Sequence, residues 1–305
     1  MQEALWQMYK NKLTTAEKAV QVVKNGDWVF YSHFAMFPFE LDRALAKRVG
    51  EIEDVSVVVS TAMHPAQVAA CDKNHESFTY YSTFFSANDR KLAKEGLCYY
   101  IPGTFREEPD RIRQGYYPHP NVAMVKTTTM DERGFFNFGT SCSYIGAAVE
   151  AADIVIVEVS ESVPRCLGGH TECVHISDVD FIVESKEMPL PEVHRPIPQE
   201  EDIKIAQHVV NEIPDGACLQ LGIGAVPNTI GHLLAESELK DLGVHSEMMC
   251  DAFLELYKRG KITNRRKFTN RNKMVYTFAM GSRELYEFLH DNPACATFPV
   301  DYTNA

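Results

Sequence analysis

The chain has 305 residues, which is enough for about two domains of ordinary size. Its residues are 45% hydrophobic and 24% charged, a composition typical of folded globular proteins and unlike that of disordered or fibrous chains. The formal net charge of -12 argues against a nucleic-acid partner, because it provides no general positive field for a polyanion.

The first 20 residues carry no sign of a targeting segment. They are polar and of mixed charge, and they lack the apolar core of a secretory signal. No stretch approaches the roughly 18 consecutive apolar residues of a membrane span. The eight cysteines are scattered without a CxxC pair, in a chain too long to depend on disulfides. We therefore expect reduced thiols, a cytoplasmic protein and no membrane partner.

Residues 1–185 alternate between short apolar runs and segments of helical periodicity. We expect strands at 28–31, 55–59, 122–125 and 154–157, and helices at 15–24 and 39–48. Apart from Ser56, the runs at 55–59 and 154–157 are apolar on consecutive residues, as in strands that are covered on both faces. The pattern predicts an α/β domain over residues 1–185.

Residues 186–202 form the clearest boundary. Their prolines lack the N–H that helices and sheets need, which predicts a linker between two domains. The prolines are Pro189, Pro191, Pro196 and Pro198.

The alternation resumes in residues 203–305. We expect helices around 200–212, 227–240, 252–258 and 283–290, and strands at 217–221, 244–246, 274–279 and 297–300. Strands joined by helices of this length imply parallel βαβ crossovers. Because the sequence stops just after an expected strand, we expect a truncated or cleaved chain whose second domain is incomplete.

A glycine turn follows the expected strand 217–221. It consists of Gly222, Ile223, Gly224 and Ala225. Two closely spaced glycines let backbone N–H groups face a ligand, and the start of the next helix adds a partial positive charge. An anion or a developing oxyanion could bind there; the alternative is an ordinary strand-to-helix turn. A dinucleotide fingerprint would need Gly or Ala in place of Pro227, so dinucleotide binding is disfavoured.

Glu247 follows the expected strand 244–246. In a doubly wound sheet the carboxyl ends of neighbouring strands meet at one edge, so we expect Glu247 beside the glycine turn. A carboxylate in that position can attack a carbonyl while fixed N–H groups receive the charge. The alternative is a solvated turn residue.

His170, Glu172 and His175 form an HxExxH pattern that differs from the HExxH of zinc proteases. The two glycines directly before it, Gly168 and Gly169, disfavour the helix that such a site requires. We therefore expect no metal site.

Several blocks of the chain resemble the acetyl-CoA hydrolase/transferase family, most of all its butyryl-CoA:acetate and 4-hydroxybutyrate CoA-transferases. These blocks are GIGAVPN, LGVHSEM, FAMGSRELYEFLHDNP and PVDYTN, together with residues 130–141, 153–159, 163–169 and 173–180. They occur in the family's order and span nearly the whole chain.

The resemblance implies an α/β fold of two similar open domains with mostly parallel sheets, the second incomplete in this chain. It implies that Glu247 is the catalytic nucleophile and that the turn from Gly222 to Ala225 lines the substrate and CoA site. It also implies a homo-oligomer. Family members continue past the last block, so a cleaved C-terminal segment of the same protein is a further expected partner.

The function that the resemblance implies is CoA transfer between a short-chain acyl-CoA and a carboxylate such as acetate, through a glutamyl-CoA thioester. Coenzyme A would be a substrate, with no separate cofactor. The alternatives are an acyl-CoA hydrolase on the same scaffold and a non-catalytic CoA-binding module. The acyl chain length and the acceptor stay open.

A basic run and an aromatic cluster each have two possible interpretations. The basic run is either a solvated loop or a site for the CoA phosphates; it consists of Lys261, Arg265, Arg266, Lys267, Arg271 and Lys273. The aromatic residues between 78 and 85 either pack a core or line the acyl pocket.

Overall fold

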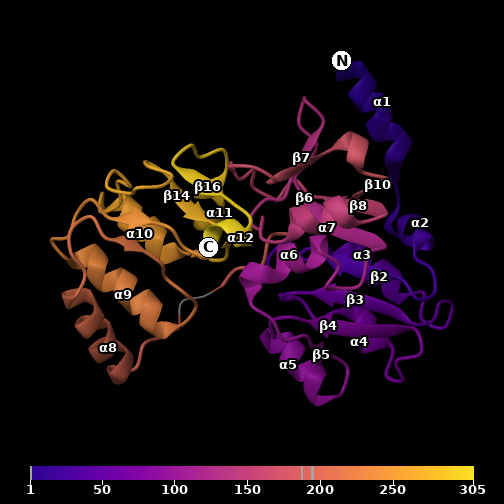
Figure 1. Cartoon of the computed structure of the whole chain (residues 1–305), viewed down its shortest axis with the longest axis horizontal. Helices are drawn as coiled ribbons and strands as arrows, with labels where there is room; N and C mark the ends of the chain where they lie inside the picture. Colours follow the sequence, from indigo (N-terminus) through magenta and orange to yellow (C-terminus); the bar gives the residue numbers. More distant parts are fainter. Residues whose placement is uncertain (1, 187, 194–195) are drawn as a thin grey trace.

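The computed structural model of the chain describes residues 2–186, 188–193 and 196–305. Figure 1 shows two lobes, an N-terminal lobe coloured from indigo to pink and a C-terminal lobe coloured from orange to yellow. The described part of residues 186–199 contains neither helix nor strand, and three residues of the expected linker, 187, 194 and 195, lie outside the described residues. Helix α8 (Glu200–Asn211) begins inside the expected linker. The domain limits at 185 and 203 stay predictions.

The N-terminal lobe is built around one sheet of eight strands, all paired in parallel. The strand order is β1 (Leu13–Thr14), β10 (Phe181–Glu184), β8 (Ile154–Val159), β6 (Val122–Thr127), β2 (Trp28–Tyr31), β3 (Val55–Val59), β4 (Phe78–Ser82) and β5 (Tyr99–Tyr100). The four expected strands are confirmed. The order changes direction between β2 and β6, and ligands of open α/β sheets bind at the carboxyl end of such a switch point.

Apolar side chains cover both faces of this sheet. Val29 and Val57 face one hydrophobic core, while Phe30 and Val58, the residues that follow them, face the other. Successive strand residues point to opposite faces, which is why these strands are apolar on consecutive positions. The first core includes residues of α2 (Ala16–Ala19), α3 (Phe39–Ala46), α4 (Gln67–Cys71) and α5 (Ala87–Lys94), and the second those of α1 (Gln2–Lys12), α6 (Glu108–Arg113) and α7 (Ile145–Ala151).

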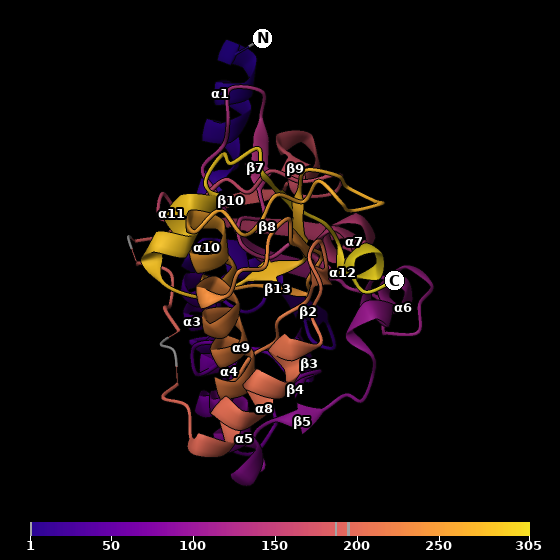
Figure 2. The same ribbon diagram turned by 90° about the vertical axis from the view of Figure 1, so that its left-hand side faces the viewer.

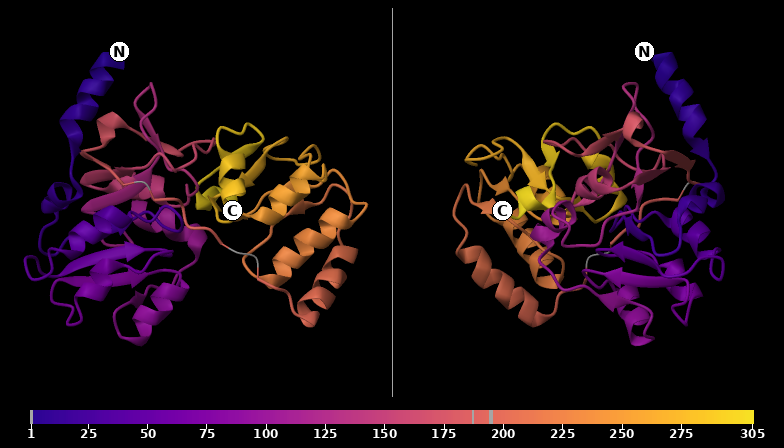
Figure 3. Two further views of the ribbon diagram at one scale, coloured as in Figure 1. Left: turned by 180° about the vertical axis from the view of Figure 1, so that it is seen from behind. Right: turned by 45° about the vertical axis from the view of Figure 1, so that its right-hand side comes forward.

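Smaller elements complete the N-terminal lobe. The antiparallel strands β7 (Phe135–Asn137) and β9 (Cys173–His175) pair apart from the main sheet. Figure 3 shows α1 projecting from this lobe. The 3-10 helices are η1 (Val20–Val22), η2 (Phe105–Glu107) and η3 (Ile176–Asp178).

The C-terminal lobe has a shorter, interrupted parallel sheet. Its strand pairs are β11 (Cys218–Leu219) with β12 (Gly243–Val244), β14 (Met274–Tyr276) with β16 (Cys295–Thr297), and β13 (Met248–Met249) with β15 (Phe278–Ala279). A parallel bridge between His245 and Val275 joins the first two pairs. The helices are α8, α9 (Ala225–Glu236), α10 (Asp251–Lys258), α11 (Arg283–Leu289) and α12 (Val300–Thr303). Figure 2 views the molecule from this lobe, with α8, α9 and α10 in front.

All four strands expected in this lobe differ from the structure. The strands expected at 217–221 and 244–246 are only two residues long, as β11 and β12. The run 274–279 is split into β14 and β15, because Thr277 leaves the regular ladder. The expectation for 297–300 is wrong at its end, since β16 stops at Thr297 and Val300 begins α12. Pro299 explains the change: it has no N–H for a ladder, and its φ of -63° suits the position before a helix.

The expected helices are close to the observed ones, with two changes. The segment 15–24 is α2 followed by η1, and the helix expected at 227–240 begins at Ala225 and ends at Glu236. None of the described helices is long and apolar enough to cross a bilayer. No disulfide joins any of the eight cysteines, all of which belong to the described residues.

Candidate active site

Glu247 lies where the C-terminal sheet is interrupted. Its carbonyl oxygen accepts the N–H of Thr277 at 3.0 Å and the N–H of Phe278 at 3.2 Å. The ladder is interrupted here: between the pairs His245–Val275 and Met248–Phe278, the Glu247 carbonyl is shared by two N–H groups. At this interruption the side chain of Glu247 is left half-buried rather than packed in the core.

Two side chains orient Glu247. Asn304, directly after α12, donates from Nδ2 to Glu247 Oε2 at 2.6 Å. The backbone N–H of Glu247 donates to Gln220 Oε1 at 3.2 Å. The carboxylate is thus held from one side while part of it stays accessible.

The glycine turn lies at the same edge as Glu247. The parallel pairing of β11 with β12 and the hydrogen bond from Leu221 N–H to Ser246 Oγ, 3.3 Å long, bring the two strand ends together. Gly224 has a φ of 135°, a conformation that side chains rarely allow. Gly222 lies outside that region, and no atom is within 4 Å of the place that a Cβ would take. Of these two positions, only Gly224 therefore has a backbone conformation that requires glycine.

The glycine turn has backbone N–H groups that are available to a ligand. Within the described part of the chain, the N–H groups of Gly222, Ile223 and Gly224 donate to no other residue. The turn is solvent-exposed, with the Ile223 side chain 57% exposed. A cavity of about 260 Å³ adjoins it and is lined in part by Ile223, Gly224, Asn228, Met248 and Met280. Unpaired N–H groups beside a largely apolar cavity suit the binding of an oxyanion.

The N-terminal lobe also reaches this region. The ring of Phe34, just after β2 at the switch point, stacks on Phe278 with centroids 3.9 Å apart. Its neighbour His33 is fully buried, and neither of its ring nitrogens has a hydrogen-bond partner among the described residues. Burial lowers the pKa of His33 to about 3, so the imidazole is neutral at physiological pH.

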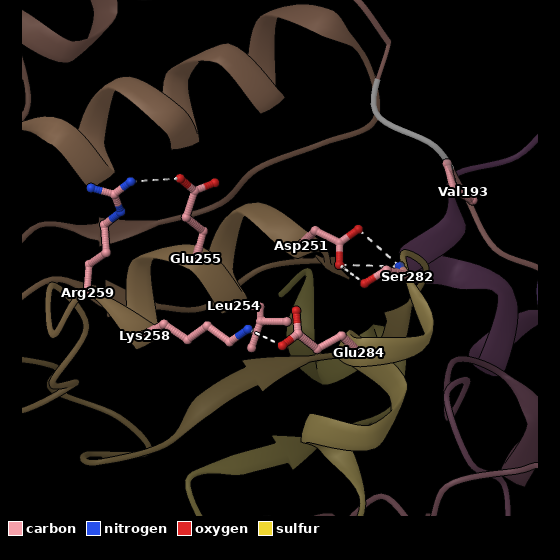
Figure 4. Close-up of a pocket in the computed structure, with 8 residues that line it drawn as sticks. All are labelled: Val193, Asp251, Leu254, Glu255, Lys258, Arg259, Ser282 and Glu284. Atoms are coloured by element: carbon pink, nitrogen blue, oxygen red, sulfur yellow. Dashed lines mark hydrogen bonds and ion pairs between the residues drawn. The ribbon is translucent and has the colours of Figure 1, made fainter.

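A larger cavity of about 460 Å³ lies elsewhere in the C-terminal lobe (Figure 4) and includes neither Glu247 nor the glycine turn. Its charged groups have partners within the same cavity: Asp251 pairs with Ser282, Lys258 with Glu284, and Arg259 with Glu255. Charges that neutralise each other are poorly available to a ligand, so this cavity is a weaker candidate than the edge near Glu247.

The basic run divides into two groups. The ammonium groups of Lys261, Lys267 and Lys273 donate to backbone carbonyls of their own lobe. Burial lowers the pKa of Lys267 to about 8, consistent with a structural position. The three arginines, Arg265, Arg266 and Arg271, are exposed, and Arg266 pairs with Asp241 at 3.4 Å. A role in phosphate binding stays a prediction for the arginines alone.

Two other features of the sequence, the HxExxH pattern and the aromatic segment 78–85, can be placed in the fold. No three His, Cys, Asp or Glu side chains of the described ranges are grouped as metal ligands, and His175 Nδ1 instead pairs with Ser177 Oγ at 2.8 Å. In the aromatic segment, Phe78 and Tyr80 pack the first core of the N-terminal lobe, whereas Phe84 is exposed. The interpretation that these aromatic residues pack a core is therefore correct for β4.

The expectation that Glu247 and the glycine turn share one edge is confirmed. Sequence reasoning missed Gln220, Asn304 and Phe34. Gln220 and Asn304 lie inside conspicuous sequence blocks, but only the folded chain shows that both bind Glu247. Nothing in the sequence signals that Phe34 meets Phe278, because the two residues belong to different lobes.

The chain is similar to known proteins over nearly its whole length. A family model for the acetyl-CoA hydrolase/transferase N-terminal domain matches residues 2–194. The chain is 47% identical to the butyryl-CoA:acetate CoA-transferase of Anaerostipes caccae, over 97% of this chain and 66% of that protein. It is 36% identical to the 4-hydroxybutyrate coenzyme A transferase of Clostridium kluyveri, over 98% of this chain and 68% of that protein. The chain thus spans about two thirds of the length of these relatives.

Solved structures share the fold. RipA from Yersinia pestis superposes with a TM-score of 0.90 at 33% identity, covering 98% of this chain and 70% of RipA. The 4-hydroxybutyrate CoA-transferase from Porphyromonas gingivalis gives a TM-score of 0.79 at 31% identity, with 98% of this chain and 70% of that chain covered. The α/β architecture expected from the sequence is confirmed.

Proposed function

The chain belongs to the acetyl-CoA hydrolase/transferase family, and we propose that it transfers coenzyme A between a short-chain acyl-CoA and a carboxylate such as acetate. Similarity to butyryl-CoA:acetate and 4-hydroxybutyrate CoA-transferases supports butyryl-CoA or 4-hydroxybutyryl-CoA as the donor. The observation that carries the proposal is the half-buried carboxylate of Glu247, oriented by Asn304 at the edge where the glycine turn presents N–H groups.

The proposed route begins with attack of a Glu247 carboxylate oxygen on the acyl-CoA carbonyl carbon. The thioester C–S bond breaks, coenzyme A leaves as a thiolate, and an acyl-glutamyl anhydride remains. The thiolate then attacks the glutamyl carbonyl, which releases the first carboxylate and leaves a glutamyl-CoA thioester. The acceptor carboxylate runs the same two steps in reverse and restores Glu247.

The chain's own groups supply orientation and charge stabilisation. Asn304 fixes one carboxylate oxygen of Glu247, which leaves the other oxygen for attack. The N–H groups of the glycine turn are the proposed donors to the oxyanion of each tetrahedral intermediate. This route uses coenzyme A as a substrate and needs no metal or redox cofactor, because the covalent intermediate conserves the thioester.

A product assay tests the proposal. The protein is incubated with butyryl-CoA and acetate, and acetyl-CoA, butyrate and free coenzyme A are measured by chromatography. We expect acetyl-CoA and butyrate to form in equal amounts with little free coenzyme A. Loss of thioester with no acetyl-CoA would identify a hydrolase instead, and no turnover with tight CoA binding would identify a binding module.

A further inference from the structure

We propose that Ser143 of the N-terminal lobe positions Glu247 for reaction, an inference that rests on the proposed function. Ser143 is fully buried in the loop before α7. Its φ of 39° lies in the left-handed region, which residues with a Cβ rarely adopt. Such a conformation persists only where the surrounding structure enforces it. Around Ser143, two chains of hydrogen bonds enforce the conformation, and both chains end at Glu247. We call them the first and the second path.

The first path runs through Thr277 to the backbone of Glu247. The carbonyl oxygen of Thr277 accepts the N–H of Cys142 at 3.0 Å and the Oγ–H of Ser143 at 3.4 Å. The N–H of the same residue, Thr277, donates to the Glu247 carbonyl at 3.0 Å. Thr277 is fully buried, so water does not compete for these bonds. The loop of the N-terminal lobe thereby holds the residue whose N–H binds the Glu247 carbonyl.

The second path runs through α12 to the carboxylate. The Val300 N–H, in the first position of α12, donates to the Ser143 carbonyl at 3.0 Å. At the other end of this helix, the Asn304 N–H donates to the Val300 carbonyl at 2.9 Å, and Asn304 Nδ2 binds Glu247 Oε2. A shift of Ser143 would therefore move the start of α12, and with it the amide that orients the nucleophile.

The two paths converge on one residue of the other lobe. The backbone of Glu247 and its carboxylate are held through different elements, yet both elements are anchored at Ser143. A catalytic group displaced by about 1 Å can lose about 100-fold in rate, because attack requires a narrow range of geometries. Ser143 touches no reacting atom in this scheme, so it acts as a positioning residue.

The test uses two substitutions that break the paths differently. Ser143→Val places a β-branched side chain at positive φ, which forces the backbone to move. Val300→Pro removes the N–H that binds Ser143 and also replaces a buried apolar side chain, while the first position of a helix tolerates proline. We expect kcat of butyryl-CoA:acetate transfer to fall about 100-fold and about tenfold, respectively, with KM for butyryl-CoA within about twofold of the wild type.

Two further variants separate positioning from general strain. Ser143→Gly loses the Oγ–H bond to Thr277 but accepts positive φ without strain and keeps the backbone N–H bonds from residues 142 and 143 to the Thr277 carbonyl, so it should keep most of the wild-type kcat. Asp54→Val introduces the same side chain at another positive φ, 57°, at an exposed position before β3. We expect this control to lower thermal stability without changing kcat. A folded Ser143→Val variant with wild-type kcat, or an equal loss of kcat in Asp54→Val, would overturn the proposal.

A readout without substrate keeps this inference separate from the proposed function. Hydrogen exchange of the Thr277 and Asn304 amides is measured in the wild type and in both path-breaking variants. We expect markedly faster exchange of both amides in Ser143→Val, and faster exchange at Asn304 in Val300→Pro. If the wild type transfers no coenzyme A, the proposed function fails while these rates still decide whether Ser143 holds the region. Unchanged exchange in both variants would refute the positioning role.

Discussion

The two sheets of the molecule are built in opposite ways. The N-terminal sheet pairs eight parallel strands and buries apolar residues on both faces. The C-terminal sheet consists of pairs only two or three residues long, interrupted at Glu247 and Thr277. An unbroken ladder commits each side chain to a face, whereas the interruption leaves a carboxylate half-buried and oriented. The comparison suits a division in which the regular sheet provides stability and the irregular one provides the proposed chemistry.

Acidic residues of the two lobes also differ, in their burial and in what binds them. In the N-terminal lobe, Asp42, Glu108 and Glu158 are buried, and burial raises the pKa of Glu108 to about 8 and those of the other two to about 7. Glu158 accepts backbone N–H groups at the start of α3, so its role is structural. The carboxylate of Glu247, by contrast, is bound by the side chain of Asn304 and is partly open to solvent.

The largest expected effect is at the interruption itself. Glu247→Gln keeps the size of the side chain and removes the nucleophile, so we expect kcat to fall by about 10⁴-fold or more with little change in stability. Steady-state transfer kinetics and thermal unfolding measure the two effects. Glu238→Gln, an exposed glutamate of the same lobe, is the matched control and should leave both unchanged. Substantial transfer by Glu247→Gln would reject the assignment of the nucleophile.

The second prediction concerns the N-terminal sheet, where we expect a substitution to lower stability and leave kcat unchanged. Phe30 is fully buried in β2, and Phe30→Ala should lower the free energy of unfolding by about 3–5 kcal/mol through lost burial and a cavity. The fraction that stays folded should keep its kcat, because Phe30 contacts a core and not the carboxylate edge. Denaturant unfolding and kinetics at low temperature check this. Loss of kcat in Phe30→Ala without loss of stability would contradict the proposed division of roles between the two sheets.

The glycine turn gives a paired prediction of intermediate size. Gly224→Ala must adopt a φ of 135°, which strains the turn, whereas Gly222→Ala meets no atom within 4 Å. We expect Gly224→Ala to lower kcat by about 100-fold, the loss typical of a displaced oxyanion donor, and to lower the free energy of unfolding by about 1–3 kcal/mol. Gly222→Ala should leave the free energy of unfolding unchanged. Equal kcat and stability in Gly224→Ala and wild type would make the turn a plain structural feature.

The smallest prediction concerns pH. Because burial raises the pKa of Glu108 to about 8, the folded state binds its proton more tightly than the unfolded state does. This contribution to stability is complete below the unfolded pKa of about 4.3 and is lost as pH rises toward 8. The slope reaches at most about 1.4 kcal/mol per pH unit for one proton. Glu108→Gln should flatten the decline between about pH 5 and 8 in denaturant unfolding; an unchanged slope would contradict it.

Much of the fold could be predicted from local pattern. Consecutive apolar residues at 55–59 and 154–157 correctly indicated strands buried on both faces. The boundaries failed where a tertiary contact outweighs the local pattern. Thr277 reads as the middle of a strand, yet its N–H turns to Glu247 in the adjacent strand, and this divides the run into β14 and β15.

The site could be predicted only in part, for the same reason. Glu247 and the glycine turn follow consecutive strands of a parallel sheet, so topology alone places them at one edge. Asn304 and Ser143 reach Glu247 through α12 and through the other lobe, and no periodicity records such contacts. Positive φ at Ser143 is likewise invisible in the sequence, because serine is not a residue that signals it.

Covalent labelling tests the central claim most directly. The protein is incubated with butyryl-CoA without acceptor, its intact mass is measured, and the labelled peptide is sequenced by mass spectrometry. We expect coenzyme A linked through a thioester to the peptide that contains Glu247, and no such adduct on Glu247→Gln. An adduct on a different residue, or turnover of butyryl-CoA with Glu247 replaced, would contradict it.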